Sequence, residues 1–482
     1  MSSTTEASPV GPAAGPEILV RAARALDELG VDGLVAARWA GLAGAGVDRV
    51  SIREVFPLGT QGGIVVVEAT IAGGGTIADG GTALLTLPLD DPATWTGLHD
   101  LIARGGSVGG VHGGRLEGRP SRGQAASHHG TARDPVPFKG IRAAPGDQSH
   151  TSVIVDETFF LKLYRRLTPG PNPEAEILVA LGHGGVAPVP AWRGSVDLIL
   201  PGAEATSIAI EQSFVADAQD AFEVLADGLA SWLHHSVGSV STVLPADIGH
   251  STGRLHQALA VTRGPAFAPR RTTPGDRASW LRAAEANIGL AIGCVVALDP
   301  GLARWLERVA PSIRDILRPL AAPDPVVLQR IHGDFHLGQV LLTPDGVLLV
   351  DFEGDPTRDP SDRRSVAMPL RDIASMLRSI DHVARSGLRR ATIKSGDAGD
   401  SAHAASLDSW IQAARTAFLT GYAAGLGDPG WLPDPDLLRA LEIEKELAEC
   451  IYAATYLPAW LYAPIGGLQG LLRSASDLEV RS

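Results

Sequence analysis

The segment from Ile331 to Asp355, IHGDFHLGQVLLTPDGVLLVDFEGD, constrains the fold of this chain more than any other. Two short apolar runs flank a Pro-Asp-Gly turn within it, and this pattern predicts a β-hairpin. Asp334 precedes the first strand, Gln339 lies just before it, and Asp351 follows the second strand. A hairpin would therefore bring these three side chains to one edge, although they are distant along the chain.

The grouped side chains are those that phosphoryl transfer requires. Asp334 supplies a carboxylate that can orient a hydroxyl group. Gln339, Asp351 and Glu353 supply oxygen ligands for magnesium. A single aspartate in a loop is more often a turn or capping residue. A His-Gly-Asp loop, an amide five residues later and a DFE triplet after a strand are much harder to explain by turn chemistry, so we interpret the segment as a catalytic loop.

The composition limits the remaining possibilities. The chain has 482 residues, too many for one compact core, and no apolar stretch long enough to span a membrane. Its two cysteines, Cys294 and Cys450, offer neither a disulfide framework nor a zinc site, and we expect a cytoplasmic protein. The net charge of −13 argues against nucleic acid as a partner. It does not argue against ATP, which a local cation and a metal can bind.

Composition also divides the chain into successive blocks. Residues 1–16 are predicted to be a disordered tail and lack the features of a signal peptide. A mixed block follows at 17–137, a β-rich block at 138–216 and a helical block at 217–482. The Gly, His and Ser-rich stretch 105–137 is predicted to be a mobile loop, and low-complexity insertions are expected at 249–276 and 384–406. Strands followed by helices in one catalytic unit predict a bilobal α+β protein.

Two places in the β-rich block are predicted to bind ATP. The first is a polar turn before a strand, where hydroxyl groups and backbone amides would cover the phosphates because the chain has no P-loop and no glycine-rich loop there: Ser149, His150 and Thr151. The second is the apolar segment 208–215, which has the place of a hinge strand beside the adenine ring. Glu211 and Phe214 belong to this segment.

A lysine and an acid complete the predicted nucleotide site. Lys162 lies in a predicted strand and would contact the phosphates, as in kinase-like enzymes. The following helix carries Glu174 and Glu176 in its first turn, and Glu176 is the preferred partner of Lys162. Each feature alone would more often be a surface lysine or an acid at a helix start. Their position upstream of the catalytic hairpin favours the functional interpretation.

Several segments carry a family resemblance: RWAG at 38–41, QSHTSVIV at 148–155, LKLYRRLTPGPNPEAE at 161–176, HGDFHLGQV at 332–340, VDFEGDP at 350–356 and PLRDIASMLRS at 369–379. In them the chain resembles actinobacterial maltokinases and their relatives, within the aminoglycoside-phosphotransferase and protein-kinase-like superfamily. The resemblance implies a protein-kinase-like fold with a β-rich N-lobe and a helical C-lobe, preceded by an N-terminal cap domain over residues 17–137. It also implies ATP- and magnesium-dependent phosphorylation of a sugar hydroxyl. Asp334 would then be the base, Gln339 and Asp351 would hold magnesium, and Lys162 would bind phosphate.

The chain departs from maltokinases in the predicted acceptor helix. Where they carry a run like YEVVYEARNRPDW, residues 448–460 read AECIYAATYLPAW, so a tyrosine, a glutamate and an Arg-Asn pair are replaced. Glu449, Tyr452 and Trp460 remain, and we predict that they bind the sugar through a carboxylate and an aromatic platform. Glu449 and Tyr452 share one helix stripe, which could instead be an exposed polar face. A carboxylate suits a protonated amine especially well, because charge-assisted hydrogen bonds are strong.

A group of maltokinase-like enzymes phosphorylates glucosamine, and the altered acceptor segment resembles that group. We therefore prefer an amino-sugar kinase that forms glucosamine 6-phosphate. The alternatives are a maltokinase that forms maltose 1-phosphate, an aminoglycoside kinase, and a catalytically dead kinase-like binding module. The expected partners are ATP and a small sugar or amino sugar, with no nucleic acid and no membrane, and we expect a monomer.

Overall fold

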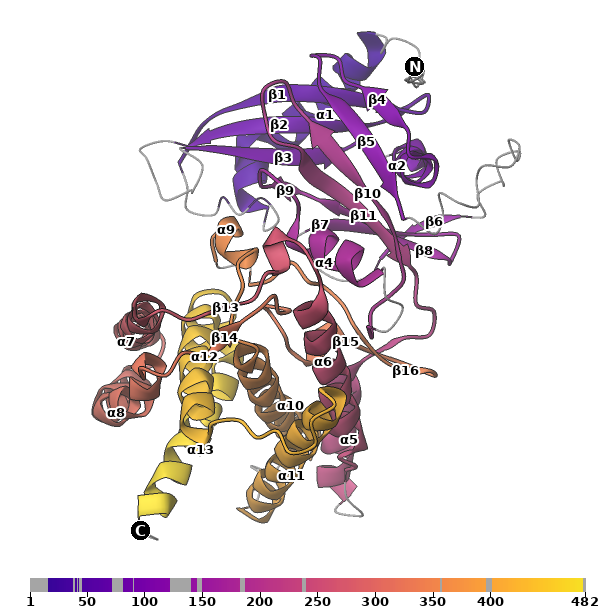
Figure 1. Cartoon of the computed structure of the whole chain (residues 1–482). Helices are drawn as coiled ribbons and strands as arrows, with labels where there is room; N and C mark the ends of the chain where they lie inside the picture. The colour runs from indigo at the N-terminus through magenta and orange to yellow at the C-terminus, as the bar shows by residue number, and fades with distance from the viewer. Residues whose placement is uncertain are drawn as a thin grey trace. The chain divides into compact units, whose positions relative to one another are not determined.

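The computed structural model describes residues 16–37, 40, 42, 46–71, 81–89, 91–121, 140–144, 150–182, 187–235, 240–355, 358–395 and 401–479. The predicted tail, apart from Pro16, lies outside these residues, as do three residues of the RWAG segment. The chain forms two compact units (Figure 1). The first comprises Met1–His183 and Pro190–Ala216, and the second comprises Gly184–Val189 and Asp217–Ser482.

The first unit begins with a helix and an antiparallel sheet. The sheet has the order β1-β2-β3-β9, with the bounds Val47–Leu58, Gly62–Ile71, Thr82–Pro88 and Arg166–Leu167. Helix α1, Pro16–Ala36, packs its apolar side chains against this sheet. Val55, Val65, Val67 and Leu85 from three strands are completely buried in the resulting core, together with Leu34 of α1. Burial of this apolar surface holds the helix on the sheet.

A seven-stranded sheet follows in the same unit, with the order β4-β5-β10-β11-β8-β7-β6. In chain order β4 to β8 have the bounds Ser107–Gly109, Arg115–Pro120, Ile141–Ala143, His150–Val155 and Phe159–Tyr164, and β10 and β11 have the bounds Trp192–Ile199 and Thr206–Ser213. Strands β4 and β5 lie in the stretch that the sequence predicts to be a mobile loop, so that prediction is wrong for residues 107–120. Residues 122–137 lie outside the described part of the chain.

A close helix–strand contact explains why strand β5 carries a glycine. Helix α2, Pro92–Arg104, covers β5 and β10 (Figure 1). At Gly118 a Cβ atom would lie only 1.8 Å from the carbonyl oxygen of Leu101 in α2, so only glycine fits there. The residue that weakens the strand pattern is therefore the residue that lets the helix pack directly on the strand.

The second unit is mainly helical. Helices α5 to α8 have the bounds Ala221–His235, Val243–Val261, Pro274–Val296 and Pro300–Leu317, and α9 to α13 have the bounds Pro360–Arg363, Leu370–Ser395, Ser401–Gly425, Pro435–Tyr456 and Tyr462–Glu479. Short strands β12 (Gln219–Asp220), β15 (Val340–Thr343) and β16 (Gly346–Leu349) form one small sheet. Strands β13 (Arg270–Arg271) and β14 (Val327–Leu328) form another. None of the described helices is both long and apolar enough to cross a membrane.

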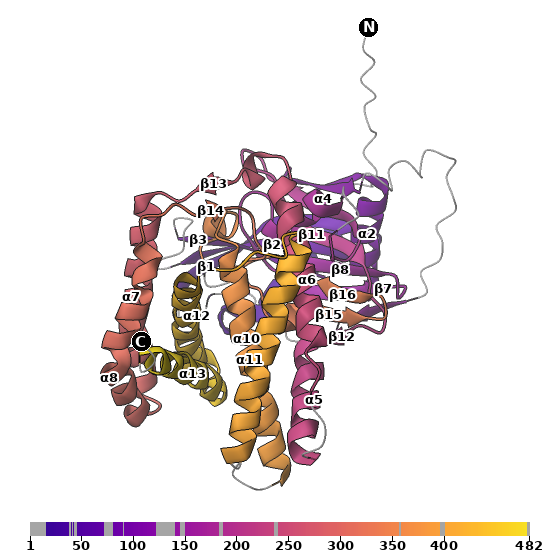
Figure 2. The ribbon, with the colours of Figure 1, turned by 60° about the horizontal axis from the view of Figure 1, so that its bottom comes forward.

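The two expected low-complexity insertions are largely helical instead. Helix α6 continues through residues 249–261, and α10 and α11 cover most of 384–406, with 396–400 outside the described residues. Figure 2 shows α5, α6, α10 and α11 running side by side. Their small residues permit this packing: a Cβ atom at Gly249 would lie 2.0 Å from the carbonyl oxygen of Phe418 in α11. A composition that looks like a loop is thus a close helix crossing.

Candidate active site

The hairpin predicted around the catalytic loop is confirmed. Strands β15 and β16 pair antiparallel, with Val340 opposite Leu349 and Thr343 opposite Gly346. The backbone N–H of Val350 donates to the carbonyl oxygen of Gln339 at 3.0 Å and closes the open end of the hairpin. Both segments that carry the predicted catalytic side chains therefore start from one rigid pair of strands.

A buried carboxylate beneath the loop fixes its backbone. The side chain of Asp372, on α10, accepts hydrogen bonds from the backbone N–H groups of His332 at 2.8 Å and Gly333 at 3.0 Å. The Nε2 atom of His256, on α6, lies 3.0 Å from the same carboxylate. Burial works to raise the pKa of Asp372, but the hydrogen bond and charge of His256 hold that pKa below its usual value. The His-Gly-Asp turn is therefore held by an ionised carboxylate.

The histidine of the turn joins the loop to the end of the hairpin. The Nε2 atom of His332 lies 2.9 Å from the carbonyl oxygen of Val350. Its ring packs against Phe335 and Phe352, with centroid distances of 5.1 and 4.6 Å, and both phenylalanines are 1% exposed. These contacts fix Asp334 relative to Asp351, which is what a transfer site needs because misplacement of reacting groups is costly.

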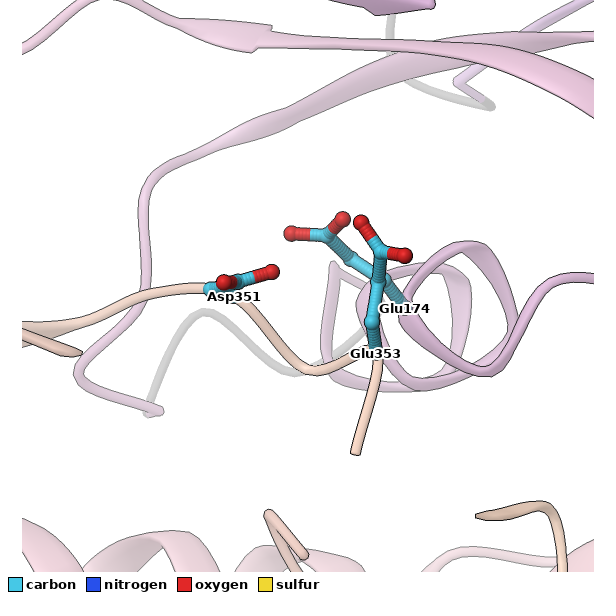
Figure 3. Close-up of side chains that lie close together, drawn as sticks. All are labelled: Glu174, Asp351 and Glu353. Carbon is cyan, nitrogen blue, oxygen red and sulfur yellow. The ribbon is translucent and has the colours of Figure 1, made fainter. Parts of the chain in front are cut away.

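The predicted magnesium ligands lie at the open end of the hairpin. The Nε2 atom of Gln339 lies 3.2 Å from Oδ2 of Asp351. Asp351 and Glu353 project from the loop that follows β16 (Figure 3). Asp351 has a φ of +67°, a left-handed conformation that is uncommon for residues other than glycine and is often found at functional sites. Two carboxylates and an amide form the oxygen-rich set that Mg²⁺ prefers, so these residues fit that ion.

The lysine of the β-rich block has a buried acidic partner, but it is not the predicted one. The Nζ atom of Lys162, on β8, lies 2.8 Å from Oε2 of Glu174, and their side chains are 3% and 2% exposed. Glu174 projects from the first turn of α4, Pro173–Gly182 (Figure 3). The prediction of Glu176 is therefore wrong. Residues two apart on a helix point in nearly opposite directions, so only one of the two acids can face the strand.

The predicted phosphate-covering turn is described only in part. Ser149 lies outside the described residues, whereas His150 and Thr151 open strand β7. The hydroxyl group of Thr151 accepts a hydrogen bond from Nη1 of Arg165 at 2.8 Å. The role of this turn in binding phosphate stays a prediction.

The predicted hinge residues have partners within the first unit. The carboxylate of Glu211, on β11, is 1% exposed and lies 2.6 Å from Nδ1 of His99, on α2. Burial works to lower the pKa of His99, but Glu211 raises it above its usual value. The guanidinium group of Arg142 lies 5.5 Å from the ring centroid of Phe214. Any contact of this strand with a nucleotide is thus expected from its backbone, as the hinge hypothesis requires.

The predicted sugar-binding residues fall into two groups. Glu449, on α12, lies 2.8 Å from Nη1 of Arg378 and 3.8 Å from Nζ of Lys445, and the Nζ atom of Lys445 lies 3.8 Å from Oδ1 of Asp334. Glu449 therefore belongs to the surroundings of the catalytic loop. Trp460 packs in an aromatic group with Phe222, Tyr462 and His382, at centroid distances of 5.5 to 6.0 Å.

Tyr452 contacts Tyr456, at a centroid distance of 5.1 Å, on the same face of α12. The exposed fraction of Tyr456 is 63%, so this end of the stripe is open. At Tyr456 the stripe is therefore an exposed helix face, which is the alternative that the sequence pattern left open.

Sequence reasoning missed two charged residues of this site, Lys445 and Arg378. Both lie on helices in patterns typical of a solvated face, and only their contacts with Glu449 reveal them. One signal was present: Lys445 precedes Glu449 by four residues, a spacing that places the two side chains together on a helix.

Comparison with known proteins assigns the class. Residues 140–441 match the family described as "Phosphotransferase enzyme family", and the chain belongs to this family. It is 32% identical over 346 residues to a glucosamine kinase of Streptacidiphilus jiangxiensis, covering 70% of this chain and 74% of that protein. It is 30% identical over 339 residues to a glucosamine kinase of Mycolicibacterium smegmatis, covering 69% and 80%.

A solved structure, described as a glucosamine kinase in complex with glucosamine, ADP and inorganic phosphate, matches with a TM-score of 0.69 and 27% identity, over 90% of this chain and 96% of that one. The protein-kinase-like fold with a β-rich part and a helical part is thereby confirmed. The enzyme class expected from the sequence, an ATP-dependent carbohydrate kinase, is confirmed at the level of the family, and Mg²⁺ is the standard cation of such kinases.

Proposed function

We propose that this enzyme transfers the γ-phosphoryl group of ATP to glucosamine and forms glucosamine 6-phosphate. The observation that carries the proposal is the carboxylate of Glu449, which Lys445 links to the catalytic base Asp334 through contacts of 3.8 Å. Two relatives and a solved structure described as glucosamine kinases support the same acceptor.

Each residue of the catalytic loop has a defined task in this proposal. Asp334 orients the acceptor hydroxyl group and accepts its proton as the phosphoryl group is transferred. Gln339, Asp351 and Glu353 would hold Mg²⁺, which neutralises charge on the phosphates when bound. Lys162, fixed by Glu174, adds a cation at the phosphates. Positioning and electrostatics thus supply nearly all the rate enhancement.

The charge state of Glu449 suits an amino sugar. Burial works to raise the pKa of Glu449, but Arg378 and Lys445 lower it below its usual value. The carboxylate is therefore ionised at neutral pH. Both cations approach Oε1, and a carboxylate offers about four acceptor positions, so it retains the capacity to bind a protonated amine. Such a charge-assisted hydrogen bond is about twice as strong as a neutral one.

An acceptor panel tests the proposal. ATP turnover with magnesium is measured against glucosamine, glucose, maltose and kanamycin at equal concentrations. We expect the highest kcat/KM for glucosamine, with a phosphorylated product whose NMR spectrum shows the phosphate on the 6-hydroxyl. A higher kcat/KM for maltose would contradict the proposal and favour a maltokinase, and a higher one for kanamycin would favour an aminoglycoside kinase.

A further inference from the structure

Lys445 occupies the centre of a group of three carboxylates. Its Nζ atom lies 3.8 Å from Oδ1 of Asp334, 3.7 Å from Oδ2 of Asp355 and 3.8 Å from Oε1 of Glu449. These three acids come from the catalytic loop, the segment after the DFE triplet and the acceptor helix α12. The Lys445 side chain is 19% exposed, so its ammonium group is partly screened from water.

The distances show that Lys445 serves the three acids together. Each is longer than the 2.7–3.2 Å of an ordinary N–H···O hydrogen bond and within the range of an ion pair. An ammonium group has three rotatable N–H donors and acts as a compact point charge, so it can hold several carboxylates at once. Without Lys445, Glu449 would keep its contact with Arg378 at 2.8 Å, whereas Asp334 would lose this ion pair.

The same lysine lines a cavity next to the catalytic loop. The cavity has a volume of about 200 Å³. Its lining includes Gly333, Asp355, Arg371, Glu444, Lys445 and Ala448. Gly333 directly precedes Asp334, so the cavity adjoins the catalytic loop. Charged side chains of both signs line it, and such a lining suits a ligand rich in hydroxyl groups better than an apolar one.

We propose that Lys445 is a positioning residue of the transfer reaction, which holds the carboxylate of Asp334 toward the acceptor hydroxyl. This inference rests on the proposed function for the identity of the acceptor.

If the role of Lys445 were purely structural, its loss would lower stability together with activity. For a positioning role we expect the fold to stay intact, because partly exposed ion pairs contribute little to stability. The reaction should nevertheless slow, because a general base acts only when it is correctly placed, and its full contribution is about 10²–10⁴-fold. Activity and stability therefore respond separately to the two roles.

The test compares Lys445→Met and Lys445→Arg with the wild type. Asp436→Asn serves as the matched control, because it removes one exposed charge from the first turn of the same helix. We expect Lys445→Met to lower kcat about 10- to 100-fold. The melting temperature of this variant should stay within a few degrees of that of the wild type, and its affinity for ADP should stay within about twofold. Lys445→Arg should restore part of kcat because it keeps the cation, and the control should match the wild type.

Two results would overturn the inference. One is a kcat of Lys445→Met within about twofold of the wild type, since then the cation does not place the base. The other is an equal loss of kcat and of ADP affinity accompanied by a lower melting temperature, which shows a structural role only.

The wild type in the same assay tests the proposed function separately. If it phosphorylates another sugar, glucosamine is excluded and the variants are compared with that sugar. If it phosphorylates none, the variants are compared in acceptor-free ATP hydrolysis, where Asp334 would orient water instead. A wild type without either reaction overturns both statements, because Asp334 then activates nothing and Lys445 has no base to position.

Discussion

Two lysines of this enzyme meet their carboxylate partners in opposite ways. In the first unit, Lys162 lies 2.8 Å from Glu174 and both side chains are almost completely buried. In the second unit, Lys445 lies 3.7 to 3.8 Å from three carboxylates, with side chains 18% to 25% exposed. The first arrangement is fixed by desolvation, because an unpaired charge there would be very costly. The second is looser and accessible, so a bound ligand can exchange places with one of its contacts.

The largest effect is expected at the base that the looser group surrounds. Asp334→Asn should reduce kcat by at least about 10³-fold, because the amide cannot accept the hydroxyl proton. Affinity for ADP, measured by calorimetry, should remain close to that of the wild type. Near-normal turnover in this variant would remove Asp334 from the mechanism.

The buried pair can be tested with two acids on one helix. Glu174→Gln should lower the free energy of unfolding by about 3 kcal/mol, because it breaks a buried ion pair of 2.8 Å. It should also raise the KM for ATP. Glu176→Gln is the matched control, and urea unfolding of both variants is the measurement. A larger destabilisation by Glu176→Gln would contradict the pairing described here.

The acceptor side of the looser group should show a smaller and selective effect. Glu449→Gln should raise the KM for glucosamine by about tenfold, since it replaces a charge-assisted hydrogen bond by a neutral one. The KM for glucose should change much less, because glucose has no ammonium group. Steady-state kinetics with both sugars provides the measurement, and equal changes would remove the amine-binding role of Glu449.

The smallest effect is expected on the pH dependence of stability, at a buried His–Glu pair of the second unit. His382 and Glu446 lie 2.9 Å apart and are buried, and burial lowers the pKa of His382 to about 3. Between pH 7 and 6 the unfolded chain takes up a proton at this histidine, whose ordinary pKa is about 6.5, while the folded protein does not. Stability that depends on the neutral histidine is therefore lost as the pH falls.

His382→Gln should remove this dependence. Relative to the wild type, the variant should gain about 0.7 kcal/mol of unfolding free energy between pH 7 and 6, measured by urea unfolding. A pH-independent difference between the two proteins would show that His382 titrates normally in the folded state.

The surroundings of the two lysines also differ in how far the sequence predicts them. The hairpin and the strand lysine follow from local patterns, because a turn signal and alternating apolar residues act over a few residues. The choice between Glu174 and Glu176 depends on where helix α4 begins, and helix boundaries are the least reliable part of such a prediction. Lys445 required still more, because two of its three partners, Asp334 and Asp355, come from loops that lie 111 and 90 residues away along the chain.

The misread loops and insertions have a similar cause. Gly118 and Gly249 are read as loop signals in a single sequence, whereas in the fold they remove side chains that would collide with a neighbouring helix. Backbone packing across the chain decides these positions, and a local pattern does not contain that information.

The glycine contact between α6 and α11 gives the enzyme a vulnerable point outside its catalytic residues. On α6, Gly253 lies less than one turn before His256, and a Cβ atom there would lie 2.4 Å from the carbonyl oxygen of Tyr422. Any larger residue would push the two helices apart and displace His256 from Asp372, the anchor of the catalytic loop. A genetic screen for loss of activity should therefore recover substitutions of Gly253 alongside those of the reacting residues, and second-site revertants should map to Tyr422 and its neighbours on α11.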